Sequence, residues 1–263
     1  IVDEVIAFGH NPATLQKALD KGAADTVTTS MEEAVKDADI VVSAVPVEAM
    51  ESVFTEMAPF LKSDAVVTDV GSTRQTVIAA ARKGLGDKFH QYAPAHPIAG
   101  GEMPGVDYAS ADLFDEKVVI STPDEGMDPK VVTFIEEAWR KAGARVQAMS
   151  PLQHDLTFAS VSHLPHVLAY ALVDMIAREE NAQEKLKMAG AGFRDFTRIA
   201  SSSPVMWRDI CLSNREALSH ELKRYRASLD TLQKYIDESD GKALESVFEN
   251  AVRNRRGLVF PGK

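Results

Sequence analysis

The sequence predicts a doubly wound α/β domain, a parallel sheet with helices on both faces, followed by an all-helical domain. In the first half, short apolar runs without polar alternation, such as residues 40–45, alternate with helical patterns. Such runs are typical of parallel strands that are buried on both faces. After Ser150-Pro151 the strand patterns cease, and apolar residues recur at helical spacing. We therefore expect one domain at residues 1–149 and a second at residues 150–263.

Helix caps and apolar runs place the elements of the first domain. Asn11 with Pro12 predicts the start of a helix, because a side-chain cap and a first-turn proline favour initiation. Ser72 with Gln75 predicts another start, as a capping box. The predicted strands cover residues 5–8, 40–45, 65–70, 90–95, 118–121 and 145–149. The predicted helices cover residues 11–22, 30–36, 47–61 and 128–143, with one more that begins at Ser72.

The second domain is predicted to contain long helices and a surface for a second subunit. One helix is expected at about residues 151–176. A later helix carries a bundle-like apolar seam, which consists of Leu218, Leu222, Tyr225, Leu229, Leu232 and Ile236. A long seam on a small helical domain needs a partner, so we expect a homodimer through this domain. The basic tail at residues 253–263 is expected to be loosely held.

Composition excludes several classes of protein. The formal net charge of −10 argues against nucleic acid as a partner, because phosphates require a basic face. No apolar run reaches the roughly 18–20 residues that a membrane helix needs, and no signal peptide opens the chain. The single cysteine, Cys211, cannot form an internal disulfide, which agrees with a reducing compartment. We therefore expect a cytoplasmic protein with no membrane and no nucleic-acid partner.

The usual cofactor fingerprint of such a sheet is not found. A dinucleotide-binding sheet opens with a strand, a G-x-G-x-x-G turn and a helix, and the glycines let a pyrophosphate approach the helix N-terminus. The chain contains no such motif, and Ile1 lies where the second strand of such a sheet would begin. We expect that the first strand, its turn and its helix were removed or were never present. On element order alone, a fold that binds no dinucleotide is the alternative.

The end of the first predicted strand, Gly9-His10-Asn11, lies where an acidic residue would hold the adenosine ribose. No carboxylate is present there, and Asn11 is more simply explained as a helix cap. His10 could contact the ribose or a 2′-phosphate. The missing carboxylate removes a repulsion against that phosphate, but no arginine attracts it. The sequence therefore leaves the choice between NAD and NADP open.

His96 is the first candidate catalytic residue. It ends a predicted strand before a loop rich in Pro and Gly, and the ligand crevices of open α/β sheets lie at the carboxyl ends of strands. An imidazole titrates near neutral pH, which suits a general base. A loop histidine bonded to backbone is the commoner alternative. Ser72 also follows a strand, and its alternative role is the helix cap.

Polar residues of the second domain form another group. Asp155, Ser162 and His166 are seven and four residues apart, so they share one helix face, either as a pocket wall or as a solvated face. Arg194 and Arg198 offer planar forks that suit a carboxylate, with a surface ion-pair network as the alternative.

No metal site is expected. His154, His163 and His166 lie on one predicted helix, but no cysteine cluster or second motif supports a metal. At helical spacing, Trp207 is most often a core residue.

Three segments together resemble the prephenate/arogenate (cyclohexadienyl) dehydrogenase family of tyrosine biosynthesis. They are His-Pro-Ile-Ala-Gly-Gly-Glu from His96 to Glu102, Ser-His-Leu-Pro-His from Ser162 to His166, and Gly-Phe-Arg-Asp-Phe-Thr-Arg-Ile-Ala from Gly192 with Met-Trp-Arg-Asp downstream. The last segment is long and idiosyncratic, and the resemblance runs from about Val5 to the seam helix. The chain departs from the family at the absent Gly-rich turn and at His10, where many members carry Asp.

The resemblance implies a Rossmann-like first domain and the oxidative decarboxylation of prephenate or arogenate with NAD or NADP, giving 4-hydroxyphenylpyruvate or tyrosine. His96 would accept the proton of the ring hydroxyl, Ser72 would orient both groups, and Arg198 would pair with a substrate carboxylate. The other implied pocket residues are Ser162, His166, Asp155, Asp195 and Trp207, with Glu102 at the mouth. The cofactor would contact Gly9, His10, Asn11, Val45, Pro46 and Ser72. Tyrosine is a further expected ligand, as an inhibitor.

Two other functions compete with this one. A β-hydroxyacid dehydrogenase or imine reductase would carry a catalytic lysine on the first helix of the second domain, and residues 151–176 contain no lysine. A catalytically inactive cofactor or metabolite sensor could share the fold. The set His96, Ser72 and Arg198 argues against a sensor, whereas the absent Gly-rich turn argues for it. Turnover and a cofactor titration distinguish the two.

Overall fold

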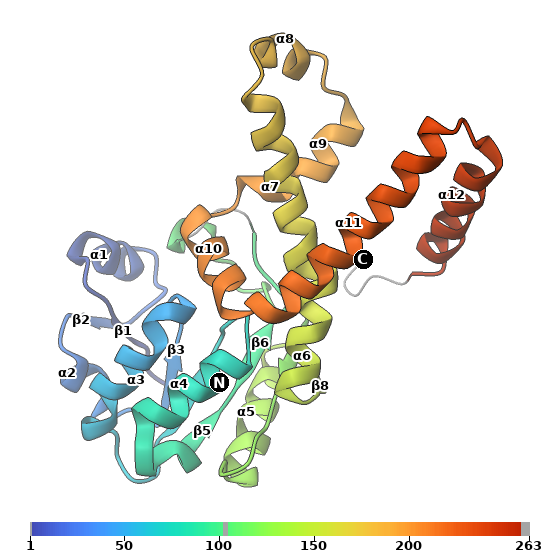
Figure 1. Ribbon diagram of the computed structural model, residues 1–263. Helices are drawn as coiled ribbons and strands as arrows, with labels where there is room; N and C mark the ends of the chain where they lie inside the picture. The colour runs from blue at the N-terminus through green and yellow to red at the C-terminus, as the bar shows by residue number, and fades with distance from the viewer. Residues whose placement is uncertain (1, 102–104, 259–263) are drawn as a thin grey trace.

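The computed structural model describes residues 2–101 and 105–258, and an α/β part is followed by a helical part (Figure 1). The predicted strands are confirmed, with the predicted strand at 90–95 divided in two, and a short strand at 26–28 is added. The strands are β1 (Ile6–Phe8), β2 (Thr26–Thr28), β3 (Ile40–Ser43), β4 (Val66–Asp69), β5 (Tyr92–Ala93), β6 (Ala95–Pro97), β7 (Val118–Ser121) and β8 (Arg145–Ala148).

The helices of the α/β part begin close to their predicted caps. They are α1 (Pro12–Asp20), α2 (Met31–Val35), α3 (Met50–Met57), α4 (Gln75–Leu85) and α5 (Pro129–Lys141), with 3-10 turns η1 (Val47–Ala49), η2 (Ala58–Phe60), η3 (Gly86–Gln91) and η4 (Val106–Tyr108). The Asn11 side chain accepts hydrogen bonds from the backbone N–H groups of Ala13 and Thr14, at 3.0 and 3.3 Å, which confirms the predicted cap of α1.

The strands pair mainly in parallel, as the sequence predicts. β1 pairs with β2, β3 with β4, β4 with β5, and β7 with β8, all in parallel, while β6 pairs with β7 in the antiparallel sense. The predicted Rossmann-like architecture followed by helices is therefore confirmed. Among the described residues, β1 and β3 belong to different sheets, so both present an unpaired edge.

A buried core holds β3, β4 and β5 against the helices of the first part. Met50 and Phe54 on α3, Val77 on α4 and Val67 on β4 are fully buried. Tyr92 on β5 packs edge-on against Phe54, with 5.6 Å between ring centroids. This packing fixes β4 and β5, which carry Asp69 and Tyr92 of the buried network beside the candidate site.

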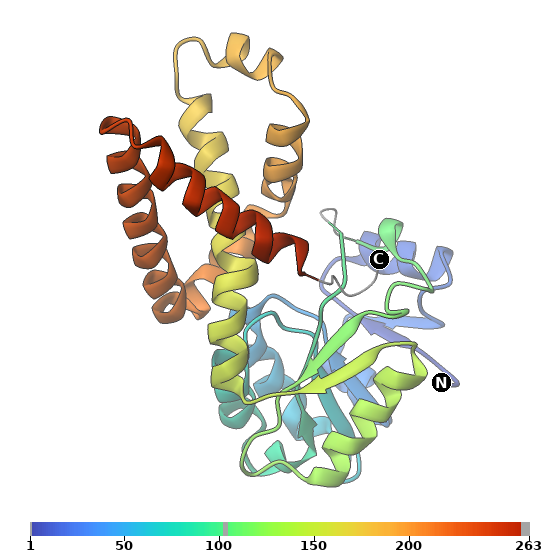
Figure 2. The same ribbon diagram turned by 90° about the vertical axis from the view of Figure 1, so that its right-hand side faces the viewer.

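The helical part begins with a long helical segment, residues 151–177, that extends away from the sheet, and the later helices return towards the sheet (Figure 2). Its helices are α6 (Pro151–Phe158), the π-helical turn η5 (Ala159–His163), α7 (Leu164–Ala177), α8 (Ala182–Lys187), α9 (Ala191–Thr197), η6 (Arg198–Ser201), α10 (Pro204–Ser213), α11 (Arg215–Asp237) and α12 (Gly241–Arg256). α6, η5 and α7 together form the helix predicted at residues 151–176, and α11 is the predicted seam helix.

The helix from Pro151 to Ala177 corrects one expectation. Its most apolar window of 18 residues has a mean hydropathy of 1.4, so by length and composition it could cross a membrane. The sequence analysis sought an unbroken apolar run, whereas this helix intersperses histidines among apolar residues and continues through the π-helical turn. Only 28% of that window is buried within the chain.

The C-terminal hairpin corrects a second expectation. Arg253 to Arg256, assigned to a loosely held tail, form the last turn of α12, which packs back along α11 (Figure 1). The seam of α11 is only partly covered by this packing. Leu229 and Ile236 remain 47% and 58% exposed.

Candidate active site

His96 lies on β6, where the sheet meets the first helix of the helical part. Its ring Nδ1 is 2.8 Å from Nε2 of His154, which belongs to α6. The two rings cross at 60° with centroids 5.0 Å apart, and the Phe158 ring lies 5.1 Å from the His96 ring. His96 is partly exposed, whereas His154 is fully buried. The alternative of a histidine bonded to loop backbone is therefore not what the structure shows for Nδ1.

Asp155 is buried behind His154 and joins the two parts of the chain. One carboxylate oxygen is 2.9 Å from Nδ1 of His154 and also accepts the backbone N–H of Arg74 at 2.7 Å. The other oxygen accepts the backbone N–H of Gln75 at 2.9 Å. A side chain of the helical part thus caps the N-terminus of α4, where the free N–H groups and the helix dipole favour an anion.

The predicted capping box of Ser72 and Gln75 is therefore wrong. The N-cap of α4 is Arg74, two residues after the predicted Ser72, and the side chain of Arg74 makes no cap hydrogen bond. Asp155, 80 residues further along the chain, supplies the acceptor instead. A local pattern cannot reveal a cap that comes from another element. Ser72 lies in the loop between β4 and α4 and is partly exposed, which leaves its hydroxyl free of the capping role.

Arg74 fixes the backbone next to His96. Its guanidinium is fully buried and makes a bidentate ion pair with Asp69, with N–O distances of 2.8 and 2.9 Å. It also donates to the carbonyl oxygen of Ala95 at 3.0 Å. The Tyr92 hydroxyl donates to Asp69 at 2.5 Å. Because Ala95 directly precedes His96, this buried network holds the strand that carries His96.

The surroundings keep His96 neutral. Burial lowers the pKa of His96 well below its ordinary value; His154, when it is protonated, and the positive charge of Arg74 lower it further. Burial likewise lowers the pKa of His154, although Asp155 opposes the shift. Burial alone would raise the pKa of Asp155, but hydrogen bonds from His154, Arg74 and Gln75 hold it below its usual range. The carboxylate is thus ionised and the imidazoles are neutral.

His166 and Trp207 form a stacked pair on the neighbouring helices. Their rings lie 3.6 Å apart at 20°, and Nδ1 of His166 donates to the carbonyl oxygen of Ser162 at 2.9 Å. Trp207 is buried, and among the described residues its indole N–H has no hydrogen-bond partner. Ser162 lies in the π-helical turn η5, a local distortion that often marks functional positions. His163 is buried next to this pair, and Nδ2 of Asn214 lies 3.2 Å from its Nδ1.

The two other predicted substrate residues of the helical part are exposed. Arg198 opens η6, and Asp195 lies on α9 beside Arg194, 3.4 Å away. Both lie on the segment that returns from α8 towards α10 (Figure 1). The predicted residue Glu102 lies outside the described residues. The structure thus brings His96, His154 and Asp155 together, and separately His166, Ser162 and Trp207.

The predicted cofactor residues follow the ends of two strands. Gly9, His10 and Asn11 come after β1, with His10 exposed and Asn11 engaged as the cap of α1. Val45 and Pro46 come shortly after β3, and Pro46 is exposed. Both groups follow the carboxyl ends of strands, where the ligand crevice of an open α/β sheet lies.

The pyrophosphate of a dinucleotide usually binds at a glycine-rich turn between a strand and a helix. Among the described residues, no glycine-rich turn joins a strand to a helix. Strands β1 and β3, each with one unpaired edge, carry exposed apolar side chains, with Ile6 38% and Val42 53% exposed. The described residues therefore include no glycine-rich turn for a pyrophosphate.

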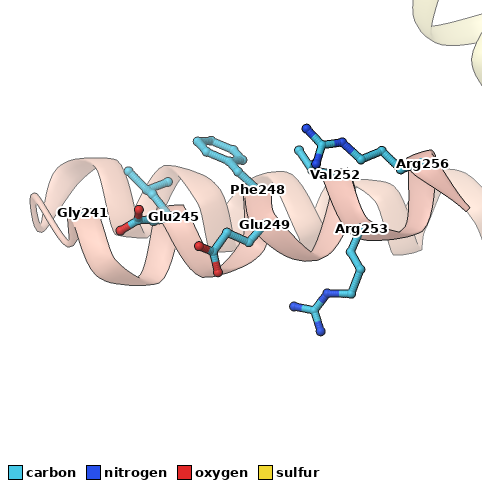
Figure 3. Close-up of a pocket in the computed structure, with 8 residues that line it drawn as sticks. Gly241, Glu245, Phe248, Glu249, Val252, Arg253 and Arg256 are labelled. Carbon is cyan, nitrogen blue, oxygen red and sulfur yellow. The ribbon is translucent and has the colours of Figure 1, made fainter.

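Two surface hollows lie elsewhere. One runs along α12, where Phe248 and Val252 lie on its apolar side and Glu245 and Glu249 beside them (Figure 3). The other lies between α4 and the start of α6, between Gln75 and Leu152. Neither is lined by His96. The clustering of histidines, and not the size of a hollow, identifies the candidate site.

Sequence reasoning missed two residues of this site. His154 was weighed only as a metal ligand, and Arg74 was not considered. The signal for His154 was its place next to Asp155, on a helix with further histidines. Arg74 gave no sequence signal, because its role depends on the distant residues Asp69 and Ala95.

The chain is similar to known dehydrogenases over nearly its whole length. Residues 2–148 match the family model of the prephenate dehydrogenase nucleotide-binding domain, and residues 150–250 match that of the prephenate dehydrogenase dimerization domain. Cyclohexadienyl dehydrogenase of Zymomonas mobilis is 38% identical over 92% of this chain and 82% of its own length. Prephenate dehydrogenase of Bacillus subtilis is 35% identical over 94% of this chain and 67% of its own.

Solved structures agree. Prephenate dehydrogenase from A. aeolicus, in complex with hydroxyphenyl propionate and NAD⁺, superposes with a TM-score of 0.88 and 34% identity, over 96% of this chain and 88% of that one. Arogenate dehydrogenase of Synechocystis gives a TM-score of 0.79 and 25% identity, over 97% of this chain and 91% of that one. The chain therefore belongs to the prephenate dehydrogenase family.

Proposed function

We propose that the protein oxidises and decarboxylates prephenate, arogenate or both, with NAD⁺ or NADP⁺, and releases 4-hydroxyphenylpyruvate or tyrosine. The observation that carries the proposal is the neutral His96 at the junction of the two parts of the chain, with its pKa lowered and its Nδ1 held by His154. The family of the chain and the substrates named for its relatives support the choice of substrate.

His96 is proposed as the general base. The bound nicotinamide supplies a hydride acceptor. As the ring carbon of the substrate loses its hydride, Nε2 of His96 takes the proton of the hydroxyl on that carbon, and a carbonyl forms. The ring carboxylate then leaves as CO₂, and the electrons of its bond enter the ring, which becomes an aromatic phenolate. The imidazolium of His96 can return the proton to this oxygen, so that the base is restored.

Substrate binding is proposed for the helical part. Arg198 would pair with a substrate carboxylate, because a guanidinium matches two oxygens at once. His166, stacked on Trp207, and the nearby Ser162 would form a pocket wall. Ser72 would orient the substrate hydroxyl towards His96. Asp195 would lie at the rim, while Asp155 acts from behind through His154.

The cofactor is proposed to contact Gly9, His10 and Asn11 at its adenosine end and Val45, Pro46 and Ser72 nearer the nicotinamide. His10 stands where an acidic residue would select NAD⁺ over NADP⁺. Neither a carboxylate nor an arginine follows β1 directly, so the sequence and fold leave the preference to measurement.

The assembly is proposed to be a homodimer through the helical part. The exposed apolar side chains of α7, α11 and α12 support this, since Met175, Ile236 and Phe248 are each more than half exposed. The division into residues 1–149 for the cofactor and 150–263 for substrate and dimerisation belongs to the same proposal. We further propose a cytoplasmic location and inhibition by tyrosine, the product of the arogenate reaction.

The test is an assay of reduced-cofactor absorbance with prephenate and arogenate, each with NAD⁺ and NADP⁺, with and without added tyrosine. We expect turnover in at least one combination, and the ratios assign substrate and cofactor. If no combination shows turnover while a titration shows that the cofactor binds, the reaction is wrong and the sensor function holds. If neither turnover nor cofactor binding is observed, both the proposed reaction and the sensor function are contradicted.

A further inference from the structure

In the proposed reaction His154 exchanges no proton with the substrate, yet it is the only polar contact that the structure gives to the ring of His96 among the described residues. It is fully buried between Asp155 and His96. The Phe158 ring stacks on it, with 4.4 Å between centroids and 27° between planes. A buried imidazole held on both nitrogens and on one face has a fixed orientation.

Asp155, His154 and His96 form a hydrogen-bonded row, and the chemistry of these bonds determines which ring nitrogen carries each proton. An ionised carboxylate only accepts hydrogen bonds, so Nδ1 of His154 must carry a proton and donate the 2.9 Å hydrogen bond to Asp155. A neutral imidazole with a proton on Nδ1 has its lone pair on Nε2. That lone pair faces Nδ1 of His96 at 2.8 Å, so Nδ1 of His96 must be the donor. In the neutral ring of His96, the lone pair is therefore on Nε2.

We propose that His154, oriented by Asp155, is a positioning residue that holds His96 in the Nδ1–H tautomer and so leaves Nε2 free to act as the base. The inference rests on the proposed function, because it assigns a use to Nε2. The logic is that of a carboxylate that orients a catalytic histidine, lengthened by one imidazole. When His96 takes up a proton, its Nδ1–H still donates to His154, and the imidazolium is stabilised without moving.

The other charged groups near the row do not supply this function. The buried guanidinium of Arg74 is neutralised by Asp69 and contacts the backbone before His96, not its ring. His163, from η5, contacts Asn214 and raises the local potential only if protonated. Among the described residues, His154 is thus the group that selects the tautomer.

Two substitutions separate positioning from other roles. His154→Leu fills the space but offers no acceptor for the Nδ1–H group of His96. The His96 ring should therefore change to the Nε2–H tautomer, in which Nε2 has no lone pair to accept the substrate proton. We expect turnover to fall on the order of 10²-fold or more, as when the orienting carboxylate of a catalytic triad is altered. His154→Gln keeps an amide oxygen for His96 and an amide N–H for Asp155, and we expect a loss of less than about tenfold. His90→Leu, at an exposed histidine before β5, is the matched control and should change neither the turnover nor the tautomer of His96.

The direct readout is ¹⁵N NMR of the histidine rings, in which protonated and unprotonated ring nitrogens resonate far apart. The His96 signal is assigned by its loss in His96→Asn. We expect Nδ1–H for the wild type and His154→Gln, and Nε2–H for His154→Leu, with thermal unfolding confirming that each variant folds.

The inference is overturned if His154→Leu keeps the Nδ1–H tautomer. It is also overturned if His154→Gln keeps the tautomer but loses as much turnover as His154→Leu, because His154 would then have to carry a proton. Since the spectrum needs no substrate, it separates the two proposals. A tautomer change without turnover in the wild type would contradict the proposed reaction and leave the positioning role intact.

Discussion

At the scale of single residues, Arg198 is the side chain whose proposed role is easiest to isolate, because it is exposed at the start of η6, whereas the network around His96 is largely buried. Arg198→Gln should raise the KM for prephenate or arogenate at least tenfold and change kcat little, since a charge-assisted bond to a carboxylate stabilises by roughly 1.5–3 kcal/mol. Steady-state kinetics measures both constants. Arg194→Gln, one turn earlier on α9, is the control. An unchanged KM for Arg198→Gln would remove it from the substrate site.

His163 makes a prediction about pH and stability. Burial lowers the pKa of His163 from 6.5 to about 4, and its ring is 1% exposed. Its unfolded form binds a proton below about pH 6.5 and its folded form only below about 4, so stability is present above pH 6.5 and is lost as the pH falls towards 4. The difference corresponds to about 3 kcal/mol at its full extent.

His163→Gln should therefore flatten the fall in unfolding free energy between pH 6.5 and 4, measured by urea denaturation. Gln can still accept the hydrogen bond of Asn214. His220→Gln, at an exposed position on α11, should leave the fall unchanged. A slope in His163→Gln equal to that of the wild type would show that His163 is not buried in its neutral form. His96, His154 and His166 also have lowered pKa values and account for the remaining slope.

The residues of the site show how far the sequence could predict it. His96 was identified from its strand end, but its partner could not be, because His154 and Asp155 are 58 and 80 residues from the groups that they contact. Ser72 shows the opposite error, since a pattern that usually caps a helix does not do so when a buried carboxylate from elsewhere occupies the position.

At the scale of elements, the N-terminus of α4 is the mechanical link between the sheet and the helical part. Asp155→Asn should destabilise the fold by about 1–3 kcal/mol, because both oxygens accept N–H groups and an amide must turn a donor towards one of them. Thermal or urea unfolding measures this. Asp128→Asn at the N-cap of α5 is the control and should cost little, since Asn caps as well as Asp. Equal effects in both variants would mean that Asp155 is only an ordinary cap.

The elements themselves were largely predictable. Short apolar runs located β3, β4 and β7, the cap at Asn11 located α1, and the change of pattern at Ser150-Pro151 located α6. The π-helical turn η5 was not, because a single inserted residue changes the backbone ladder without changing the apolar pattern. Strand β2 is short and partly exposed and lacks an apolar run, so it gave no signal.

At the scale of the whole molecule, the exposed apolar faces predict self-association. Light scattering should give a dimer, and Phe248→Asp on α12 should shift the population towards monomer, because it places a charge on the apolar side of the hollow in Figure 3. Lys242→Asp, on the same helix, is a control for the added charge. A monomeric wild type would contradict the homodimer, and a fully dimeric Phe248→Asp would place the interface on other helices, α7 or α11.

The proposed reaction makes the whole molecule necessary, because the base lies on the sheet and its orienting residues lie on the first helix of the helical part. The sequence predicted both parts, but it did not predict that His96 of the sheet would bind His154 of the helical part. Contacts between distant segments depend on the packing of the two parts, which no local pattern contains.

The most direct test of the account is the turnover of His96→Asn beside the wild type, under the conditions in which the wild type oxidises prephenate or arogenate. We expect kcat to fall on the order of 10²–10⁴-fold, with an unchanged circular dichroism spectrum and an unchanged affinity for the substrate. A folded His96→Asn enzyme with the kcat of the wild type would contradict it, because the proton of the substrate hydroxyl would then have another acceptor.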